Sequence, residues 1–418
     1  MTPAKGYAKM KDSGIEWVGM IPATWDVFPA GGVFDEVKEK NVNNQYSNPF
    51  SFRYGEIVDK KIAGEIDESV EETLSAYRVV SPNTIMINGL NLNYDFISQR
   101  VAIVREKGII TSAYLAVQPD EGRIVPRFVL YLLKAYDYRQ VFHGVGSGIR
   151  KTLKFQDFKS IKIVAPSLTE QTAIASYLDA QCAKIDEIIA QAKASIEDYK
   201  QWKASIIYEA VTKGLDPNVE MKDSGIPWIG KIPVHWAISR IKNIATNLDY
   251  LREPISAENR ENKLGLYDYY GASGVIDKID DYNVDDTVLL IGEDGANLRM
   301  RNLPLVYRAS GKFWVNNHAH ILKVKPGCSD GYVAYLLEAG DYNVYITGSA
   351  QPKLSQFNLM RFPIVIPDFK EQVQIEKYLD KWCLQIDTLI AEKEDFLIDL
   401  ESYKKSLIYE VVTGKRRM

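Results

Sequence analysis

The sequence predicts an α+β protein in which two mixed domains are separated by two long antiparallel helices that form a coiled coil, arranged as a pseudo-two-fold internal repeat. Three observations lead to this fold class. A motif of 16 residues occurs twice, a helical segment without glycine or proline occurs twice, and each helical segment follows a region of short apolar runs broken by Gly, Asn and Pro. Each half of the chain therefore has the order motif, mixed region, long helix.

The bulk composition limits the class of protein. A length of 418 residues is too great for one ordinary core, and 46% hydrophobic with 25% charged residues is typical of a folded, soluble protein. No apolar run approaches the roughly 18 residues of a membrane span, and the N-terminus lacks the apolar core of a signal peptide. Three scattered cysteines fit a reducing compartment, so we expect a cytoplasmic protein. The net charge of -4 predicts no partner.

The repeated motif reads MKDSGIEWVGMIPATW at 10–25 and MKDSGIPWIGKIPVHW at 221–236, identical at 11 of 16 positions. A second repeat, beginning with EQ at Glu170 and Glu371, has an offset of 201 residues. So long a period indicates a duplicated unit rather than a solenoid. We interpret the motif as the corner that joins helix to domain. The first helix leads directly into the second motif, which predicts that the N- and C-termini are neighbours.

The segments 170–212 and 371–413 are rich in good helix formers and predict two long helices. Apolar residues recur with a seven-residue period, which indicates a coiled-coil seam. The seam residues are Leu178, Cys182, Ile185, Ile189, Ile196 and Tyr199 in the first segment, and Leu379, Cys383, Ile386, Ile390, Leu397 and Leu400 in the second. Lys203, Lys393 and Lys404 interrupt the seam, so we expect the pairing to loosen toward the C-terminal ends. A helix of this length spans about 65 Å and can act as a rigid spacer.

The mixed regions contain short apolar runs that predict strands, such as TIMI at 84–87 and TVLLIG at 287–292. One amphipathic helix is expected in each region, at 127–142 and at 330–345. The predicted division of the chain is 1–22 and 215–233 for the repeat motifs, 23–166 and 234–367 for the α+β domains, and 167–214 and 368–418 for the long helices. The two mixed domains otherwise share little sequence.

This order, with D-S-G-I-x-W-x-G-x-I-P-x-x-W opening each half, resembles the DNA specificity subunit of type I restriction-modification systems. The resemblance covers nearly the whole chain. Further blocks that resemble the family lie at 146–171, 348–372, 269–274 (YYGASG) and 315–322 (VNNHAHIL). Each block is weak alone, but together and in this order they are highly specific.

The resemblance implies a non-catalytic subunit whose two target-recognition domains each read one half of a split site in double-stranded DNA. It also implies that the helices dock two methyltransferase subunits, which flip and methylate adenine, and that restriction subunits join this core. S-adenosylmethionine, ATP and Mg are then expected on the partner subunits, and no cofactor on this chain. Because the two domains differ in sequence, the full site should be asymmetric.

Candidate DNA contacts follow from local charge, since bases are read by Arg, Lys, Asn and Gln side chains. The stretch from Arg139 to Lys162 holds six basic residues and one acid, and the stretch between Asp294 and Asp330 holds six basic residues and no acid. The candidates are Asn91, Asn93, Arg100, Arg150, Lys151 and Lys154 in the first domain, and Asn297, Arg299, Arg301, Asn316, Asn317, His318, His320, Gln351 and Lys353 in the second. A solvated charged face is the alternative for each one, and a turn is the alternative for Asn91 and Asn93.

Other chemistry has weaker support. HGVGSG at 143–148 follows a predicted helix and opens no βαβ unit, which argues against a dinucleotide or S-adenosylmethionine loop. His318 and His320 could face a metal, but the sequence offers no cysteine or carboxylate cluster nearby to complete a zinc site. Two rival functions remain, a stand-alone DNA methyltransferase and a coiled-coil scaffold without DNA contact. Cofactor binding would favour the first rival, and the absence of salt-dependent DNA binding would favour the second.

Overall fold

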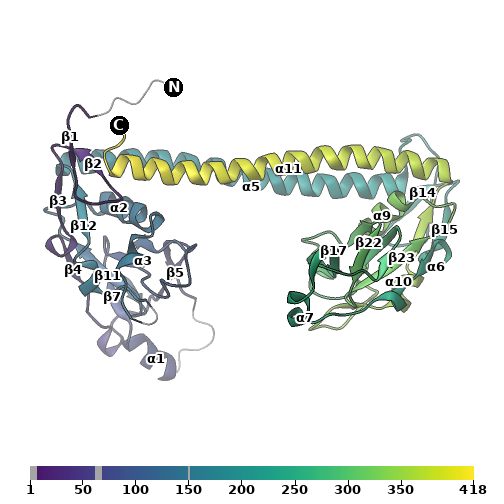
Figure 1. Cartoon of the computed structure of the whole chain (residues 1–418), viewed down its shortest axis with the longest axis horizontal. Coiled ribbons are helices and arrows are strands. Elements are labelled where there is room, and N and C mark those ends of the chain that lie inside the picture. The colour runs from purple at the N-terminus through teal and green to yellow at the C-terminus, as the bar shows by residue number, and fades with distance from the viewer. Residues whose placement is uncertain (1–6, 62–67, 149–150) are drawn as a thin grey trace. The chain divides into compact units, whose positions relative to one another are not determined.

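The computed structural model describes residues 7–61, 68–148 and 151–418. The chain divides into two compact units. Unit 1 comprises Met1–Ala192 with Asp395–Met418, and unit 2 comprises Lys193–Glu394. Each unit holds one mixed domain and a part of both long helices (Figure 1). None of the helices in the described part of the chain combines the length and the apolarity that crossing a lipid bilayer requires.

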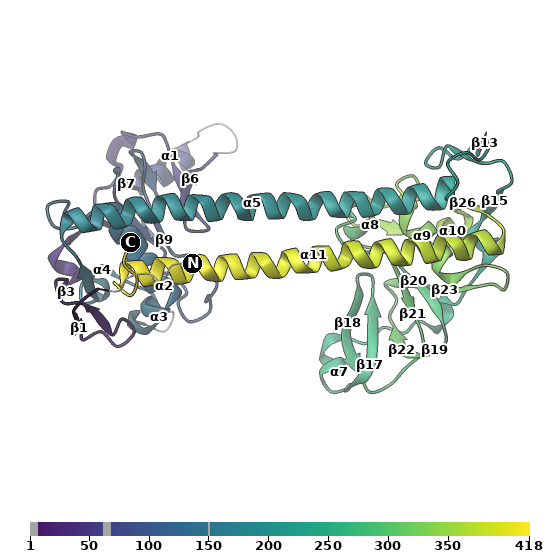
Figure 2. The same cartoon turned by 90° about the horizontal axis from the view of Figure 1, so that it is seen from above.

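The two long helices are α5 (Leu168–Lys213), with 46 residues, and α11 (Phe369–Val412), with 44 residues. Both are continuous in the ribbon, so the prediction of two long helices is confirmed (Figure 2). Gly214 directly follows α5 with a φ of 77°, and Gly414 lies two residues beyond α11 with a φ of 70°. This left-handed conformation suits glycine, and it follows the end of each helix at places one residue apart in the repeat.

The helices pair antiparallel within each unit. In unit 2, Lys203 Nζ lies 2.6 Å from Asp387 Oδ2, and Lys393 Nζ lies 5.7 Å from the centre of the Tyr199 ring. In unit 1, the equivalent ion pair joins Lys404 to an oxygen of Asp186 at 2.6 Å. The lysines that interrupt the seam thus form cross-helix contacts instead of loosening the pairing as expected. Each partly exposed ion pair stabilises the folded state by about 0.2–1 kcal/mol.

The seam is most deeply buried where a helix also packs on its own domain. Leu178 and Leu379 are fully buried, and both belong to the hydrophobic cores of their units. Cys182, Cys383, Ile185, Ile386 and Ile196 are also buried, whereas Ile189, Tyr199, Ile390, Leu397 and Leu400 are half-buried. The side chains therefore serve both the helix pair and the domain that rests on it.

The mixed domains share one sheet topology despite their different sequences. The four-stranded antiparallel sheet of unit 1 has the order β4 (Phe34–Glu36), β11 (Leu115–Pro119), β8 (Ile85–Ile87), β9 (Val101–Ile103). That of unit 2 has the order β16 (Ala245–Asn247), β23 (Ala319–Val324), β20 (Val288–Gly292), β21 (Val306–Ala309). The central strands are almost entirely buried. The duplication therefore extends to the contents of each half as well as to its frame.

The main domain helices are α2 (Pro126–Tyr138) and α9 (Asp330–Ala339), and both are shorter than predicted. Gln140 has a φ of 57°, which separates α2 from α3 (Val141–Val145), and α9 ends before Gly340. Tyr131 on α2 donates to Asp179 of α5 at 2.7 Å, and Tyr335 on α9 donates to Asp380 of α11 at 2.9 Å. Each domain is therefore tied to a long helix by the same tyrosine–aspartate bond.

The repeated EQ pair has a structural role in both halves. Gln171 and Gln372 are each 1% exposed. The Gln171 Oε1 atom accepts the Val125 N–H at 2.7 Å, and the Gln372 Oε1 atom accepts the Ser329 N–H at 2.9 Å. These bonds satisfy backbone donors beside the first residues of α2 and α9, where a helix leaves N–H groups without partners.

The repeated motif forms a hairpin in each unit, β1 (Met10–Asp12) with β2 (Met20–Pro22) and β13 (Met221–Asp223) with β14 (Lys231–Pro233). The Trp17 carbonyl accepts the Tyr409 hydroxyl at 2.9 Å, and the Trp228 carbonyl accepts the Tyr208 hydroxyl at 2.9 Å. The motif is thus the corner between helix end and domain, as predicted. The Lys415 ammonium also donates to the Val18 carbonyl at 2.6 Å, so the two ends of the chain are neighbours.

The remaining elements include one further pair that the two domains share, β3 (Asp26–Pro29) with β12 (Lys162–Ala165) in unit 1 and β15 (Ala237–Arg240) with β26 (Pro363–Ile366) in unit 2. Unit 1 also contains η1 (Ala30–Gly32), η2 (Val42–Asn44), β5 (Phe50–Arg53), β6 (Glu56–Asp59), α1 (Glu68–Ser75), β7 (Arg78–Val80), β10 (Gly108–Ile110) and α4 (Phe155–Phe158). Unit 2 also contains α6 (Ile241–Ile244), η3 (Asp249–Leu251), α7 (Ala257–Glu261), β17 (Leu264–Gly271), β18 (Gly274–Ile279), β19 (Val284–Asp285), α8 (Asn297–Met300), β22 (Lys312–Val315), β24 (Ile346–Thr347), β25 (Lys353–Leu354) and α10 (Gln356–Arg361). A second four-stranded sheet, β18-β17-β22-β19, occurs in unit 2.

Candidate nucleic-acid interface

Two loops lie together in each domain and carry most of the predicted DNA contacts. We call the connection after the central strand the strand-end loop, residues 88–100 in unit 1 and 293–305 in unit 2. We call the second connection the GS loop, residues 146–154 in unit 1, where 149 and 150 lie outside the described residues, and 348–354 in unit 2. Both loops begin or end at buried strands or short helices, which gives them fixed ends.

The same backbone bond joins the two loops in both units. The Leu153 N–H donates to the Gly89 carbonyl at 2.9 Å, and the Leu354 N–H donates to the Glu293 carbonyl at 2.8 Å. The backbones of the two loops are therefore joined in the same way in both units, and we call this joined pair of loops the shared loop platform. The side chains on the platform differ between the two domains. A shared platform with differing side chains is what two readers of different sequences require.

In unit 1, the strand-end loop is organised by Arg100. Its side chain is 0% exposed, and its guanidinium donates to the Asn88 carbonyl at 2.9 Å, to the Leu90 carbonyl at 2.8 Å and to the Asp95 carbonyl. The prediction that Arg100 contacts DNA is therefore wrong, because its donors point at the chain's own backbone. Its role is to hold the loop in one conformation.

The Arg100 backbone is held in turn by a buried carboxyl. Asp137 Oδ2 accepts the Arg100 N–H at 2.8 Å. Burial raises the pKa of Asp137 to about 6, although the bond to Arg100 and its charge act in the opposite direction. The difference from the ordinary value of 3.8 corresponds to about 3 kcal/mol. A carboxyl whose pKa rises on folding favours the folded state in its protonated form, so its ionisation opposes folding.

Asp137→Asn is therefore expected to stabilise unit 1 at pH 8 by up to about 3 kcal/mol, and to have little effect near pH 4. The amide oxygen can still accept the Arg100 N–H while the buried charge is removed. The wild-type chain should lose this stability as the pH rises from about 4 through about 6. Denaturant unfolding of both proteins across this range measures the difference. A gain that is independent of pH would contradict the assignment.

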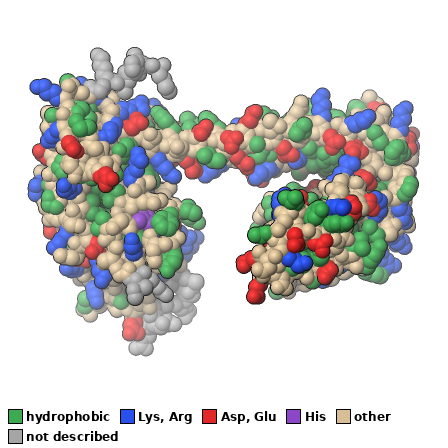
Figure 3. Space-filling view, in the orientation of Figure 1, with side chains coloured by type: hydrophobic (Ala, Val, Ile, Leu, Met, Phe, Trp, Pro, Cys, Tyr) green, Lys and Arg blue, Asp and Glu red, His purple; other side chains and the backbone are tan. Residues whose placement is uncertain are grey.

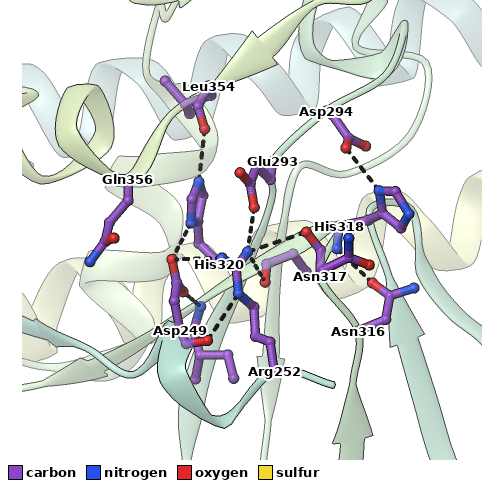
Figure 4. Close-up of polar contacts among 12 residues, drawn as sticks. Asp249, Arg252, Glu293, Asp294, Asn316, Asn317, His318, His320, Leu354 and Gln356 are labelled. Carbon is purple, nitrogen blue, oxygen red and sulfur yellow. Dashed lines mark hydrogen bonds and ion pairs between the residues drawn. The ribbon is translucent and has the colours of Figure 1, made fainter. Parts of the chain in front are cut away.

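In unit 2, the equivalent region is a polar cluster around Arg252 (Figure 4). The Arg252 guanidinium donates to Glu293, to the Asn317 carbonyl at 3.3 Å and to the Ala319 carbonyl at 3.3 Å, and it lies 3.4 Å from Asp249. The cluster joins η3, the strand-end loop and the start of β23. It fixes the base of the interface before any ligand binds.

His320 extends this cluster to the GS loop. Its Nδ1 atom lies 2.6 Å from Asp249 Oδ2, and its Nε2 atom lies 2.8 Å from the Leu354 carbonyl. Burial alone would raise the pKa of Asp249, but the hydrogen bond and the charge of His320 outweigh it and lower that pKa. Since His320 is 0% exposed, the prediction that it contacts DNA is wrong. It connects the core of the domain to the loop.

Lysine and histidine side chains lie at the rim of the cluster. Lys353 Nζ is 3.0 Å from Glu293 Oε1, and His318 Nδ1 is 2.8 Å from Asp294 Oδ2. Burial would raise the pKa of Glu293, but the bonds from Arg252 and Lys353 and the charge of His320 lower it. The side chains of Lys353 and His318 are 55% and 48% exposed. They are therefore positioned by carboxylates and still accessible to a ligand.

The other predicted residues of unit 1 fall into three groups. Lys151 and Lys154 are exposed, as the prediction of a DNA contact requires. Asn91 is also exposed and adopts a φ of 53°, and its carbonyl accepts the Tyr94 N–H at 3.1 Å, so the turn foreseen as its alternative is present. Asn93 is half-buried. Arg150 lies outside the described residues.

The other predicted residues of unit 2 also separate by exposure. Arg299, Asn317 and Gln351 are exposed and remain candidates for DNA contact. Asn316 is 5% exposed, and its side chain accepts the His318 N–H at 2.8 Å, which contradicts its predicted role as a base reader. Two further candidates are held by neighbours. Asn297 bonds to the backbone of Leu303 and Pro304, and Arg301 donates to the Glu338 carbonyl.

The structure also corrects the reading of the two histidines. Carboxylates do lie beside them, Asp294 at His318 and Asp249 at His320, although the sequence offered no cluster nearby. Each imidazole pairs with its own carboxylate. Within residues 7–61, 68–148 and 151–418, no group of three or more His, Cys, Asp or Glu side chains has a geometry that could hold a metal ion.

Sequence reasoning missed the residues that organise the loops, above all Asp95 and Asp137 in unit 1 and Asp249, Arg252 and Glu293 in unit 2. Most of the bonds that reveal their roles join distant positions; Asp249 and His320, for example, are 71 residues apart. The only local signal was GED at 292–294, directly after a predicted strand. A carboxylate at the end of a buried strand could have suggested a buried partner of opposite charge.

The two α+β domains have one sheet topology, and each is tied to the pair of long helices. Each presents a different set of side chains on the same loop platform. This arrangement defines a class of proteins with two recognition domains. A family profile described as "Type I restriction modification DNA specificity domain" matches residues 22–198 and 233–395. The chain belongs to this family. Its role is therefore the recognition of a DNA sequence for a type I restriction-modification system.

Individual relatives agree with this family. The chain is similar to the protein described as the type I restriction enzyme MjaX specificity subunit of Methanocaldococcus jannaschii, with 23% identity over 427 residues and 96% of each chain covered. It is 30% identical over 148 residues to a type I specificity subunit of Haemophilus influenzae, a match that spans 35% of this chain and 37% of that relative. A chain from a solved structure concerned with assembly and conformational transition of the type I R-M system shares the fold, with a TM-score of 0.71, 13% identity, and 94% of this chain and 98% of that chain covered.

Proposed function

We propose that the chain reads a bipartite, asymmetric site in double-stranded DNA. Each domain reads one half-site through its strand-end and GS loops, and the helix pair sets the number of unread base pairs between the half-sites. The single observation that supports this most strongly is the shared loop platform with unlike side chains, Lys151 and Lys154 in unit 1 against Arg299 and Lys353 in unit 2. Half-sites approached from one side of the duplex lie roughly 34–36 Å apart.

The proposed division of labour leaves the chemistry to partner subunits. The chain binds no cofactor and is not itself an enzyme, while two methyltransferase subunits dock on the long helices and bring S-adenosylmethionine, and restriction subunits bring ATP and Mg. The complex works in the cytoplasm. Family membership supports the complex, and the number of partner subunits is part of the proposal. Isothermal titration of the isolated chain with S-adenosylmethionine should show no binding, and measurable binding would favour a stand-alone methyltransferase.

Lys151→Ala and Lys154→Ala test the proposed interface of unit 1. If each ammonium neutralises one phosphate, each variant should weaken binding by the assembled complex about equally for all sequences, and should reduce the slope of log affinity against log salt by about 1. The modified sequence should stay the same. Lys11→Ala, an exposed lysine on the β1 corner, is the matched control. Variants that bind like the control would remove the GS loop from the interface.

A further inference from the structure

The strand-end loop of unit 1 exposes an unusual run of apolar side chains. Tyr94 is 74% exposed, Phe96 is 55% exposed and Ile97 is 95% exposed. We call Tyr94, Phe96 and Ile97 the wedge residues, and they lie within four consecutive positions of one loop. The turn between β5 and β6 lies next to the same loop, because a Cβ added at Gly55 would meet Gln99 at 2.7 Å. That turn exposes a further aromatic side chain, Tyr54, at 90%. Large apolar surfaces of this kind mark binding sites.

The loop is held in a fixed conformation although its tips are exposed. Asp95 Oδ1 accepts the N–H of Ile97 at 3.2 Å and the N–H of Ser98 at 3.0 Å. The Phe96 ring stacks on the His143 ring at 5.0 Å, and His143 Nε2 lies 3.0 Å from the Asp95 carbonyl. With the buried Arg100 beneath them, the wedge residues need little ordering when a partner binds, which lowers the entropic cost of binding.

The surroundings of the wedge residues fit nucleic acid. The Leu92 N–H donates to the Lys151 carbonyl at 3.0 Å, so the strand-end loop that carries the wedge residues is bonded to the GS loop, and the Lys151 side chain is exposed. Arg53 is exposed on the turn that carries Tyr54. Figure 3 shows hydrophobic and basic side chains next to one another on the face of unit 1 that it presents. Apolar and aromatic side chains interleaved with cations are typical of surfaces that contact bases and phosphates together.

We propose that Phe96 and Ile97 form an apolar wedge that packs between base pairs of the half-site read by unit 1, partly unstacking one step, while Tyr94 covers the adjacent base. Unit 1 thus reads its half-site partly through the ease with which that step deforms. The equivalent loop of unit 2 exposes the cation Arg299 together with Met300, which is 62% exposed, and Leu303, which is 51% exposed, but it carries no aromatic side chain. The aromatic wedge is therefore proposed for unit 1 alone. This inference rests on the proposed DNA-reading function and adds a mode of readout to it.

The test uses the chain assembled with its partner subunits and a duplex whose modification site has been mapped by methylation sequencing. 2-Aminopurine replaces in turn each purine of both half-sites except the mapped methylated adenines and their direct neighbours, since its fluorescence rises when it is unstacked and flipping by the methyltransferase subunits would unstack those positions without the wedge. The wild-type complex should raise the fluorescence at one step of one half-site. The double variant Phe96→Ala with Ile97→Ser should abolish this rise and weaken binding roughly 5- to 150-fold, as expected for lost stacking on a base. The slope of log affinity against log salt should not change, because no phosphate contact is lost.

Val344→Ser is the control, since Val344 is an apolar residue of unit 2 that is 87% exposed. It should leave affinity and fluorescence as in the wild type. The proposal is overturned if no position brightens in the wild-type complex, if the double variant binds like the control, or if the double variant alone fails to assemble with the partner subunits, which would identify the loop as a protein contact. A wild-type complex that binds the mapped duplex no better than a scrambled one would refute the proposed function itself.

Discussion

Insertion of one heptad into both long helices is expected to lengthen the unread spacer of the DNA site and to leave both half-site sequences unchanged. Seven residues add about 10.5 Å to a helix, which matches the rise of up to about three base pairs. Insertions after Ala194 in α5 and after Asp395 in α11 lie at equivalent places in the repeat, and they keep the seven-residue seam in phase. Sequencing of methylated adenines in a strain that carries the altered chain measures the spacer directly.

The control is a heptad inserted into α5 alone. The two cross-helix ion pairs, Lys203 with Asp387 and Lys404 with Asp186, lie on opposite sides of the insertion. Because the partner helix is not lengthened, one of the two pairs must shift by about 10.5 Å, and the insertion should abolish modification. An unchanged spacer after the double insertion would show that the helices do not set the distance. Altered half-site sequences would show that the loops are not independent of the helices.

Arg100→Met is expected to destabilise unit 1 by about 3 kcal/mol or more in the absence of DNA, since a buried carbonyl left without a donor costs about 1–3 kcal/mol. The methionine fills part of the same volume but donates no hydrogen bond, so it leaves the Asn88, Leu90 and Asp95 carbonyls without the donors that they have in the wild-type chain. A residue that only contacted DNA would leave the free protein as stable as before. Denaturant unfolding of the chain without DNA distinguishes the two roles.

Arg100→Lys and Lys151→Ala complete this experiment. Lysine keeps the charge but lacks the planar fork that reaches separate carbonyls, so Arg100→Lys should recover only part of the stability. Lys151 is exposed, and its loss should change the free energy of unfolding by less than about 0.5 kcal/mol. If Arg100→Met is as stable as the wild type and loses only DNA affinity, the guanidinium is a reader after all.

The long helices and the corner motif could be predicted from the sequence because the patterns that indicate them are local or periodic. Helix propensity over 170–212 and the seven-residue recurrence predicted α5, and the repeat extended this to α11. The corner motif could be interpreted because it occurs twice at matching places. The boundaries of α2 and α9 were less accessible, since a single left-handed residue, Gln140, and one glycine, Gly340, decide where these helices end.

The interface was only partly accessible, because composition shows where charge gathers and not which charges are buried. Arg100 and Lys151 look alike in sequence, yet one is fully buried and the other exposed. The difference depends on partners that the fold brings together, such as Asp137 for the Arg100 backbone. The cation clusters pointed to the loops that we propose as the interface, whereas the roles of single residues required the three-dimensional contacts.

The most direct measurement is the genome-wide map of adenine methylation in a strain that carries this chain and its partner subunits as the only such system. If two different domains read DNA at a separation fixed by the helix pair, the map should show one motif. This motif should have two different specified halves and a fixed run of unspecified base pairs between them. A contiguous palindromic motif, or two halves with a variable gap, would contradict that arrangement.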